Sequence, residues 1–229
     1  LKVNGSQPWT QGSAGNVWPS PRWQRGARVR MVGPMKTAPN PIVELAEGCA
    51  HFVKQALEIE LDYTPETLPI LDHYLRERAD KPRAEVLSLL TPAAGAYFGE
   101  VVRRNLGPSR WFDAAFEHTC YALEFENNFM TFNPLGMALE AIQDAPADGW
   151  GAHIQVLPED QLHVKDALER VGQVSASDYH RLAIRFETLE LVEQTVLNRA
   201  ELRKETDRRF GAEVYAAARD ADDPTRVQN

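Results

Sequence analysis

The sequence predicts an α+β fold with a helical N-terminal half, a small central antiparallel sheet and a long C-terminal helix. Across residues 41–105, apolar side chains recur at steps of three and four, which is the period of amphipathic helices. Around Asn127-Asn128, two short segments alternate between faces, which indicates a β-hairpin. Residues 177–200 return to the helical period along their whole length. Helices first, then strands, then helices again are typical of the α+β class.

The predicted helices of the N-terminal half cover residues 41–61, 65–80, 82–90 and 92–105. Prolines mark most of their beginnings, because the missing N–H of proline is not needed in the first turn of a helix. Thr64 is expected to cap the second helix, with Pro65 in its first turn. Thr91-Pro92 is expected to separate the third helix from the fourth, since a proline inside a helix removes a hydrogen bond. This half of the chain is therefore predicted to be all-helical.

The middle of the chain supplies the predicted sheet. The hairpin pairs residues 120–125 with 129–132, and the next expected elements are a helix over 134–142, a strand over 152–157 and a helix over 158–171. Asn133-Pro134 starts the first of these helices, because Asn is a favourable cap and Pro fits the first turn. Ser177-Asp178 is expected to cap the long last helix.

Residues 35–219 are predicted to form a single globular domain, preceded by a leader over 1–34 and followed by a polar, disordered tail over 220–229. The leader is rich in Gly, Pro, Trp and Arg and shows no helical or strand period, so we expect it to be disordered. Because Met35 follows it, we expect the native chain to begin there and the leader not to be native. The alternative is a disordered basic arm that contacts an anionic surface.

The charge of the chain is unevenly distributed. The leader carries five basic residues and no acidic one, so subtracting its +5 from the whole-chain −8 leaves −13 on residues 35–229. Such an acidic body repels phosphate backbones, which argues against nucleic acid as the main ligand. A basic protein partner is attracted for the same reason.

The cysteines and the hydropathy pattern predict a cytoplasmic protein that does not associate with a membrane. Cys49 and Cys120 lie among apolar neighbours, and two cysteines in a chain of this length do not make a disulfide framework. We expect both to be buried free thiols. No apolar run approaches the roughly 20 residues that a membrane helix needs.

A pair of glycines marks the place where a binding site is expected. Gly95 and Gly99 are four residues apart on one helix face, and each weakens the helix by roughly 1 kcal/mol relative to Ala. Such glycines indicate that another element or a ligand comes close. The candidate binding residues beside this face are Tyr97, Glu100, Arg104 and Trp111. A Glu100 that is buried without an arginine or backbone partner favours a binding site, whereas a Glu100 paired with an arginine favours tight packing.

No motif for catalysis, a metal or a cofactor is found in the sequence. The six histidines do not form the paired spacing of zinc hydrolases or of di-iron bundles. The serines of the body are not in a nucleophile elbow, and there is no Gly-rich phosphate loop. Glu124 and Glu126 share one face of a strand and can form an acid–base pair, although a solvated sheet face accounts for them more simply. We therefore expect a protein without catalytic residues, metal or cofactor.

Part of the chain, over residues 43–145, resembles a pattern that recurs in a family of uncharacterised bacterial proteins, a domain of unknown function. The resemblance is carried by LDYTPETLPILDHYL, by GAYFGEVVRRNLG with Trp111 after it, and by Asn133-Pro134-Leu135-Gly136. The shared features are a GAYxGE helix, a Gly-x-Trp turn, a strand pair and an Asn-Pro helix start. This chain departs from the pattern at residues 107–111, where the turn is longer. The resemblance implies a shared fold and a regulatory or immunity-type accessory role.

The leading functional hypothesis is a non-enzymatic cytoplasmic interaction protein that binds a basic protein partner. Its support is the charge of −13 and the missing catalytic motifs. The alternative is a small-ligand-binding protein or an enzyme that uses a cleft near Glu100 and Trp111. A further hypothesis is a homodimer in which the C-terminal helix over residues 179–200 forms the seam.

Overall fold

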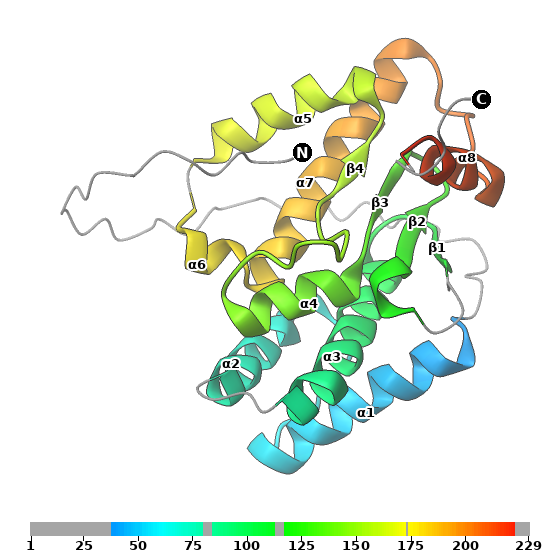
Figure 1. Cartoon of the computed structure of the whole chain (residues 1–229). Helices are drawn as coiled ribbons and strands as arrows, with labels where there is room; N and C mark the ends of the chain where they lie inside the picture. Colours follow the sequence, from blue (N-terminus) through cyan, green and yellow to red (C-terminus); the bar gives the residue numbers. More distant parts are fainter. Residues whose placement is uncertain (1–37, 80–83, 113–116, 173, 223–229) are drawn as a thin grey trace.

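The computed structural model describes residues 38–79, 84–112, 117–172 and 174–222 (Figure 1). The predicted leader over 1–34 lies outside the described residues. The α+β class is confirmed, because helices precede a small antiparallel sheet and a long helix follows it. The elements are, in order, α1 (Asn40–Leu57), the 3-10 turn η1 (Pro65–Thr67), α2 (Leu68–Ala79), α3 (Ala84–Asn105), β1 (Ser109–Phe112), the 3-10 turn η2 (His118–Cys120), β2 (Ala122–Phe125), β3 (Met130–Phe132), α4 (Pro134–Gln143), β4 (Gln155–Val156), α5 (Pro158–Val171), α6 (Ala176–Tyr179), α7 (Leu182–Arg203) and α8 (Ala212–Asp222).

The helix α3 is the centre of the fold. All of its residues from 90 to 103 are buried, and it packs against α1 on one side and α4 on the other. The predicted break at Thr91-Pro92 is wrong, because α3 continues through Pro92. A proline inside a helix costs about 3 kcal/mol. Burial of Leu90, Ala93 and Ala94 around it outweighs this cost, and local propensity could not predict that.

The two glycines of α3 allow α4 to approach closely. An added Cβ at Gly95 would lie 2.9 Å from the backbone N of Leu135, which is in the first turn of α4. An added Cβ at Gly99 would meet the Trp111 ring and would lie 3.1 Å from Cγ of Pro134. The element that needs the space is therefore α4 together with the Trp111 side chain.

The sheet is a four-stranded antiparallel meander in the order β1-β2-β3-β4. The predicted hairpin is confirmed as β2 and β3, with Leu123 opposite Phe132. The segment predicted as a lengthened turn contains the strand β1, in which Trp111 lies opposite Leu123. The third predicted strand, over residues 152–157, is shorter than expected, since its described pairing with β3 is confined to the two residues of β4.

The beginning of the long C-terminal helix differs from the prediction. The side chain of Ser175 caps the short helix α6, and Ser177-Asp178 lie inside that helix. The helix α7 begins at Leu182, where the carboxylate of Asp72 in α2 accepts hydrogen bonds from the N–H groups of Leu182 (2.8 Å) and Ala183 (3.0 Å). A cap that comes from another helix leaves no local signal in the sequence.

The apolar stripe of α7 lies in the core of its own chain. Its buried side chains include Leu182, Leu189 and Val196, and the helix packs against α2, α4 and α5. A homodimer through α7 stays a prediction, and its seam would have to use the exposed side of this helix.

The helix α8 was not predicted, and it lies against the hairpin end of the sheet (Figure 1). Tyr215 of α8 donates a hydrogen bond from its hydroxyl to the backbone oxygen of Phe125 (2.7 Å). Arg219 forms an ion pair with the buried carboxylate of Glu124. Residues 220–222 of the predicted tail are helical, and residues 223–229 lie outside the described part.

Two smaller predictions need correction. Cys49 and Cys120 are both free thiols, but only Cys49 is buried, and burial raises its pKa to about 12. Cys120 is exposed in η2, because the strand expected from residue 120 begins only at Ala122. The Thr64 side chain does not cap the following turn and instead donates a hydrogen bond to Asp62 (2.6 Å).

Candidate functional site

The structure joins the four candidate residues in one network: Arg104 and Trp111 contact the carboxylate of Glu100, and Tyr97 is linked to Arg104 through the Tyr63 ring. Tyr97, Glu100 and Arg104 come from α3, and Trp111 comes from β1. The sequence reasoning missed Tyr63, which touches both Tyr97 and Arg104. We call these side chains, with that of Arg103, the Glu100 cluster.

Glu100 is 1% exposed and is surrounded by donors. Arg103 donates to it from Nε and Nη2, both at 2.7 Å, and Trp111 donates from Nε1 at 2.9 Å. Arg104 adds a longer contact of 3.3 Å from its Nε. Burial by itself raises the pKa of Glu100, but hydrogen bonds from Arg103 and Trp111 and the charges of Arg103 and Arg104 outweigh burial and hold the pKa below its usual value. Glu100 is therefore an ionised carboxylate.

Tyr63 and Tyr97 connect the cluster to the segment between α1 and η1. Their rings stack with centroids 4.7 Å apart, and the Tyr97 hydroxyl accepts a hydrogen bond from the backbone N of Tyr63 (2.9 Å). Burial raises the pKa of Tyr97 to about 12. Tyr63 has a φ of 62°, a left-handed conformation that is rare for a bulky side chain. This strain was not visible in the sequence.

Arg104 is the part of the cluster that reaches the surface. Its side chain is 37% exposed, and its guanidinium lies 3.7 Å from the centroid of the Tyr63 ring, a cation–π contact. The Glu100 carboxylate holds it from the other side. Arg104 is thus fixed between Glu100 and Tyr63.

The chemistry of the Glu100 cluster is that of a packed junction. A general base works best with a pKa near the working pH, whereas the pKa of Glu100 is lowered and that of Tyr97 is raised to about 12. The pairing of Glu100 with Arg103 meets the condition that favours tight packing over a binding site. A binding role for Tyr97, Glu100, Arg104 and Trp111 stays a prediction.

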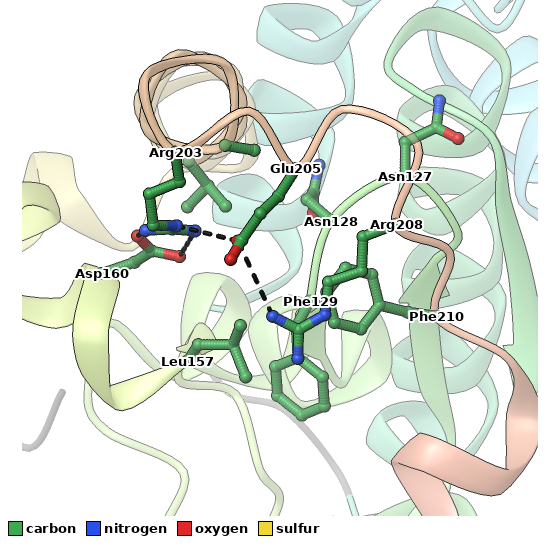
Figure 2. Close-up of a pocket in the computed structure, with 11 residues that line it drawn as sticks. Asn127, Asn128, Phe129, Leu157, Asp160, Arg203, Glu205, Arg208 and Phe210 are labelled. Atoms are coloured by element: carbon green, nitrogen blue, oxygen red, sulfur yellow. Dashed lines mark hydrogen bonds and ion pairs between the residues drawn. The ribbon is translucent and has the colours of Figure 1, made fainter.

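A second place of interest is a hollow between the β2–β3 turn, the beginning of α5, the end of α7 and the loop before α8 (Figure 2). Figure 2 shows the guanidinium of Arg203 between two carboxylates, Asp160 at 2.6 Å and Glu205 at 2.9 Å. Asn128 lines the hollow and is buried, and within the described residues its side-chain amide has no hydrogen-bond partner. The hollow has room for about one water molecule. It is therefore far below the roughly 300 Å³ at which small-molecule sites begin.

A third region is a run of exposed carboxylates over residues 40–67, from α1 to η1. This segment contains six acidic residues and one lysine, a net charge of −5. All six carboxylates are exposed: Glu44, Glu47, Glu58, Glu60, Asp62 and Glu66. Lys54 donates a hydrogen bond to Glu60, and this hydrogen bond and the positive charge of Lys54 both lower the pKa of Glu60. Thr64 hydrogen-bonds to Asp62 and lowers its pKa. We call this run the acidic α1–η1 segment.

Comparisons with known proteins give no relative, since no family model, no curated protein and no solved structure matches the chain. In the part of the chain that the structure describes, no three side chains of the metal-binding types are grouped to hold an ion. Among the described helices, none has the length and apolar character needed to cross a bilayer.

Proposed function

We propose that the chain is a non-enzymatic interaction protein of the bacterial cytoplasm, of an accessory or immunity type, and that its partner is a basic protein. The observation that supports this proposal best is the acidic α1–η1 segment, whose six exposed carboxylates face solvent with one lysine among them. The accessory or immunity-type role is proposed from the resemblance of residues 43–145 to a pattern in uncharacterised bacterial proteins.

Charge of this kind acts on association more than on the fold. An acidic surface steers a basic partner toward it and raises the association rate, while it disfavours phosphate backbones. Exposed charges are screened by salt over about 10 Å at 0.1 M ionic strength. Binding of the proposed partner therefore weakens as the salt concentration rises.

The alternative, a ligand-binding protein or an enzyme with a cleft near Glu100 and Trp111, has less support. The carboxylate that such a site would use is held by Arg103, Arg104 and the Trp111 indole. A substrate would have to displace these donors, and the arginine left behind would be a buried and unpaired charge.

The proposed function is tested by affinity capture with the tagged full chain in the organism that encodes it. Captured proteins are identified by mass spectrometry, produced separately, and titrated against the chain at about 50 mM and about 500 mM salt. The bait for the control is an unrelated protein of equal net charge. We expect to capture a basic protein that binds this chain and not the control, and we expect its Kd to be higher at the higher salt concentration. Failure to capture any specific partner, or a partner whose Kd does not depend on salt, would contradict the proposal.

A further inference from the structure

Gly48 in the middle of α1 has no packing role within the described part of the chain. A Cβ added at Gly48 would meet none of its atoms within 4 Å, whereas one at Gly95 or Gly99 would clash. Glycine weakens a helix interior relative to alanine. A glycine that no described neighbour requires points to a backbone that another molecule approaches closely.

The side chains around Gly48 form an exposed face of α1. Residues separated by three or four positions lie together on a helix. This face contains Glu44, Gly48, His51, Phe52 and Gln55, and we call it the outer face of α1. The buried stripe that contains Ile42, Cys49 and Val53 faces the core instead.

Apolar and acidic groups alternate on this surface. Phe52 is 39% exposed, and Ile59, just after the end of α1, is 42% exposed. The exposed carboxylates of Glu44, Glu47 and Glu58 flank them. Protein interfaces combine apolar anchors of this kind with a charged rim.

We propose that the outer face of α1, together with Ile59, is the docking surface for a basic segment of a partner protein. The partner's backbone passes over Gly48, its apolar side chains contact Phe52 and Ile59, and its lysines or arginines reach the carboxylates on either side. This inference rests on the proposed function and assigns it to one surface. The net charge of −5 on the acidic α1–η1 segment selects a basic partner.

The first probe is a synthetic helical peptide of leucine and lysine, as long as α1 with its 18 residues. A second peptide with serine in place of leucine keeps the charge and removes the apolar anchors. Binding to the full chain is measured by fluorescence anisotropy. We expect the leucine peptide to bind at least about tenfold more tightly than the serine peptide.

Two variants locate the binding. Gly48→Arg adds bulk and positive charge where no described neighbour is displaced, and we expect it to weaken peptide binding at least about tenfold. The triple variant Glu44→Gln, Glu47→Gln and Glu58→Gln is expected to weaken peptide binding about tenfold. Its matched control neutralises three exposed carboxylates of α7, at Glu187, Glu190 and Glu201, and should change the affinity less than about twofold. Circular dichroism spectra and unfolding midpoints establish that each variant is folded.

Three results would overturn the assignment. The first is that the wild-type chain does not prefer the leucine peptide to the serine peptide. The second is that the α7 control weakens binding as much as the α1 triple variant, which would mean that the peptide is held by non-specific charge attraction. The third is that replacing Arg22, Arg25, Arg28 and Arg30 of the leader with Gln strengthens binding even at about 500 mM salt, where long-range charge attraction is screened, which would mean that the leader itself occupies the surface. Each of these results leaves the capture of a basic partner untouched, so the proposed function and the docking surface fail separately.

Discussion

Replacing glycine with alanine should leave the protein less stable when the change is on α3 than when it is on α1. At Gly95, the new methyl group would lie 2.9 Å from N and Cγ of Leu135 and closer still to its Cα. The favourable distance between two carbon atoms is about 3.5–4.0 Å. Because the nearest atoms belong to the backbone of α4, a side-chain rotation cannot relieve the clash. At Gly48, the methyl group would meet no described atom within 4 Å.

The expected magnitudes follow from two effects. Alanine is more favourable than glycine in a helix interior by about 1 kcal/mol, and this gain is present at both positions. Overpacking a filled core costs about 1–3 kcal/mol, and only Gly95→Ala incurs it. Gly48→Ala should therefore raise the free energy of unfolding by up to about 1 kcal/mol. The free energy of unfolding of Gly95→Ala should be lower than that of Gly48→Ala by the overpacking cost, about 1–3 kcal/mol.

The assay is urea unfolding of the full chain and both variants, followed by far-ultraviolet circular dichroism. Equal m-values establish that the difference lies in stability and not in the extent of unfolding. A Gly95→Ala protein as stable as Gly48→Ala would refute the close approach of α4 to α3. A Gly48→Ala protein less stable than the wild type would refute the open position of Gly48.

Three further substitutions test contacts that join distant segments. Glu100→Gln leaves the buried Arg103 without its carboxylate and should cost about 3–5 kcal/mol of unfolding free energy. Because the pKa of Glu100 is lowered in the folded state, its ionised carboxylate stabilises the fold above the unfolded pKa of about 4.3, and this stabilisation is lost as the pH falls through the folded pKa. The free energy of unfolding of Glu100→Gln should therefore lack this pH-dependent loss. Asp72→Ala removes the cap of α7 and should cost about 1–2 kcal/mol, with faster amide hydrogen exchange at Leu182. Tyr215→Phe removes a buried hydrogen bond and should cost about 1 kcal/mol, with faster exchange in α8 measured by mass spectrometry. Unchanged unfolding or exchange in any of these variants would mean that the contact concerned does not stabilise the fold.

The sequence allowed the prediction of elements that local chemistry defines. The buried stripe of α1 follows the helical period, and the side chain of Asn133 caps α4 by accepting hydrogen bonds from Leu135 and Gly136. The hairpin of β2 and β3 surrounds the Asn127-Asn128 turn as the alternating pattern predicted.

Elements that depend on distant partners could not be predicted. The cap of α7 comes from Asp72, which is 110 residues away from Leu182 in the chain. The strand β1 has only four residues and needs β2 as its partner. Among the described side chains of α8, Tyr215 is the one that is buried. A single buried residue does not give the repeating apolar pattern by which a helix is predicted from sequence.

The candidate site was predicted in its members but not in its geometry. The sequence pointed to Tyr97, Glu100, Arg104 and Trp111, and the structure places them in one cluster. The sequence could not show that Arg103 and Arg104 both face Glu100, or that Tyr63 adopts a left-handed conformation beside Tyr97. A tyrosine directly before a Thr-Pro turn carries no signal for a positive φ.

Docking of a basic protein on the outer face of α1 is tested most directly by one pair of Kd values. The captured and purified partner is titrated by calorimetry against the wild-type chain and against Gly48→Arg at low salt. We expect the Kd to be at least about tenfold higher for Gly48→Arg, with an unfolding midpoint at least as high as that of the wild type. An equal Kd for the two proteins would contradict docking on this face.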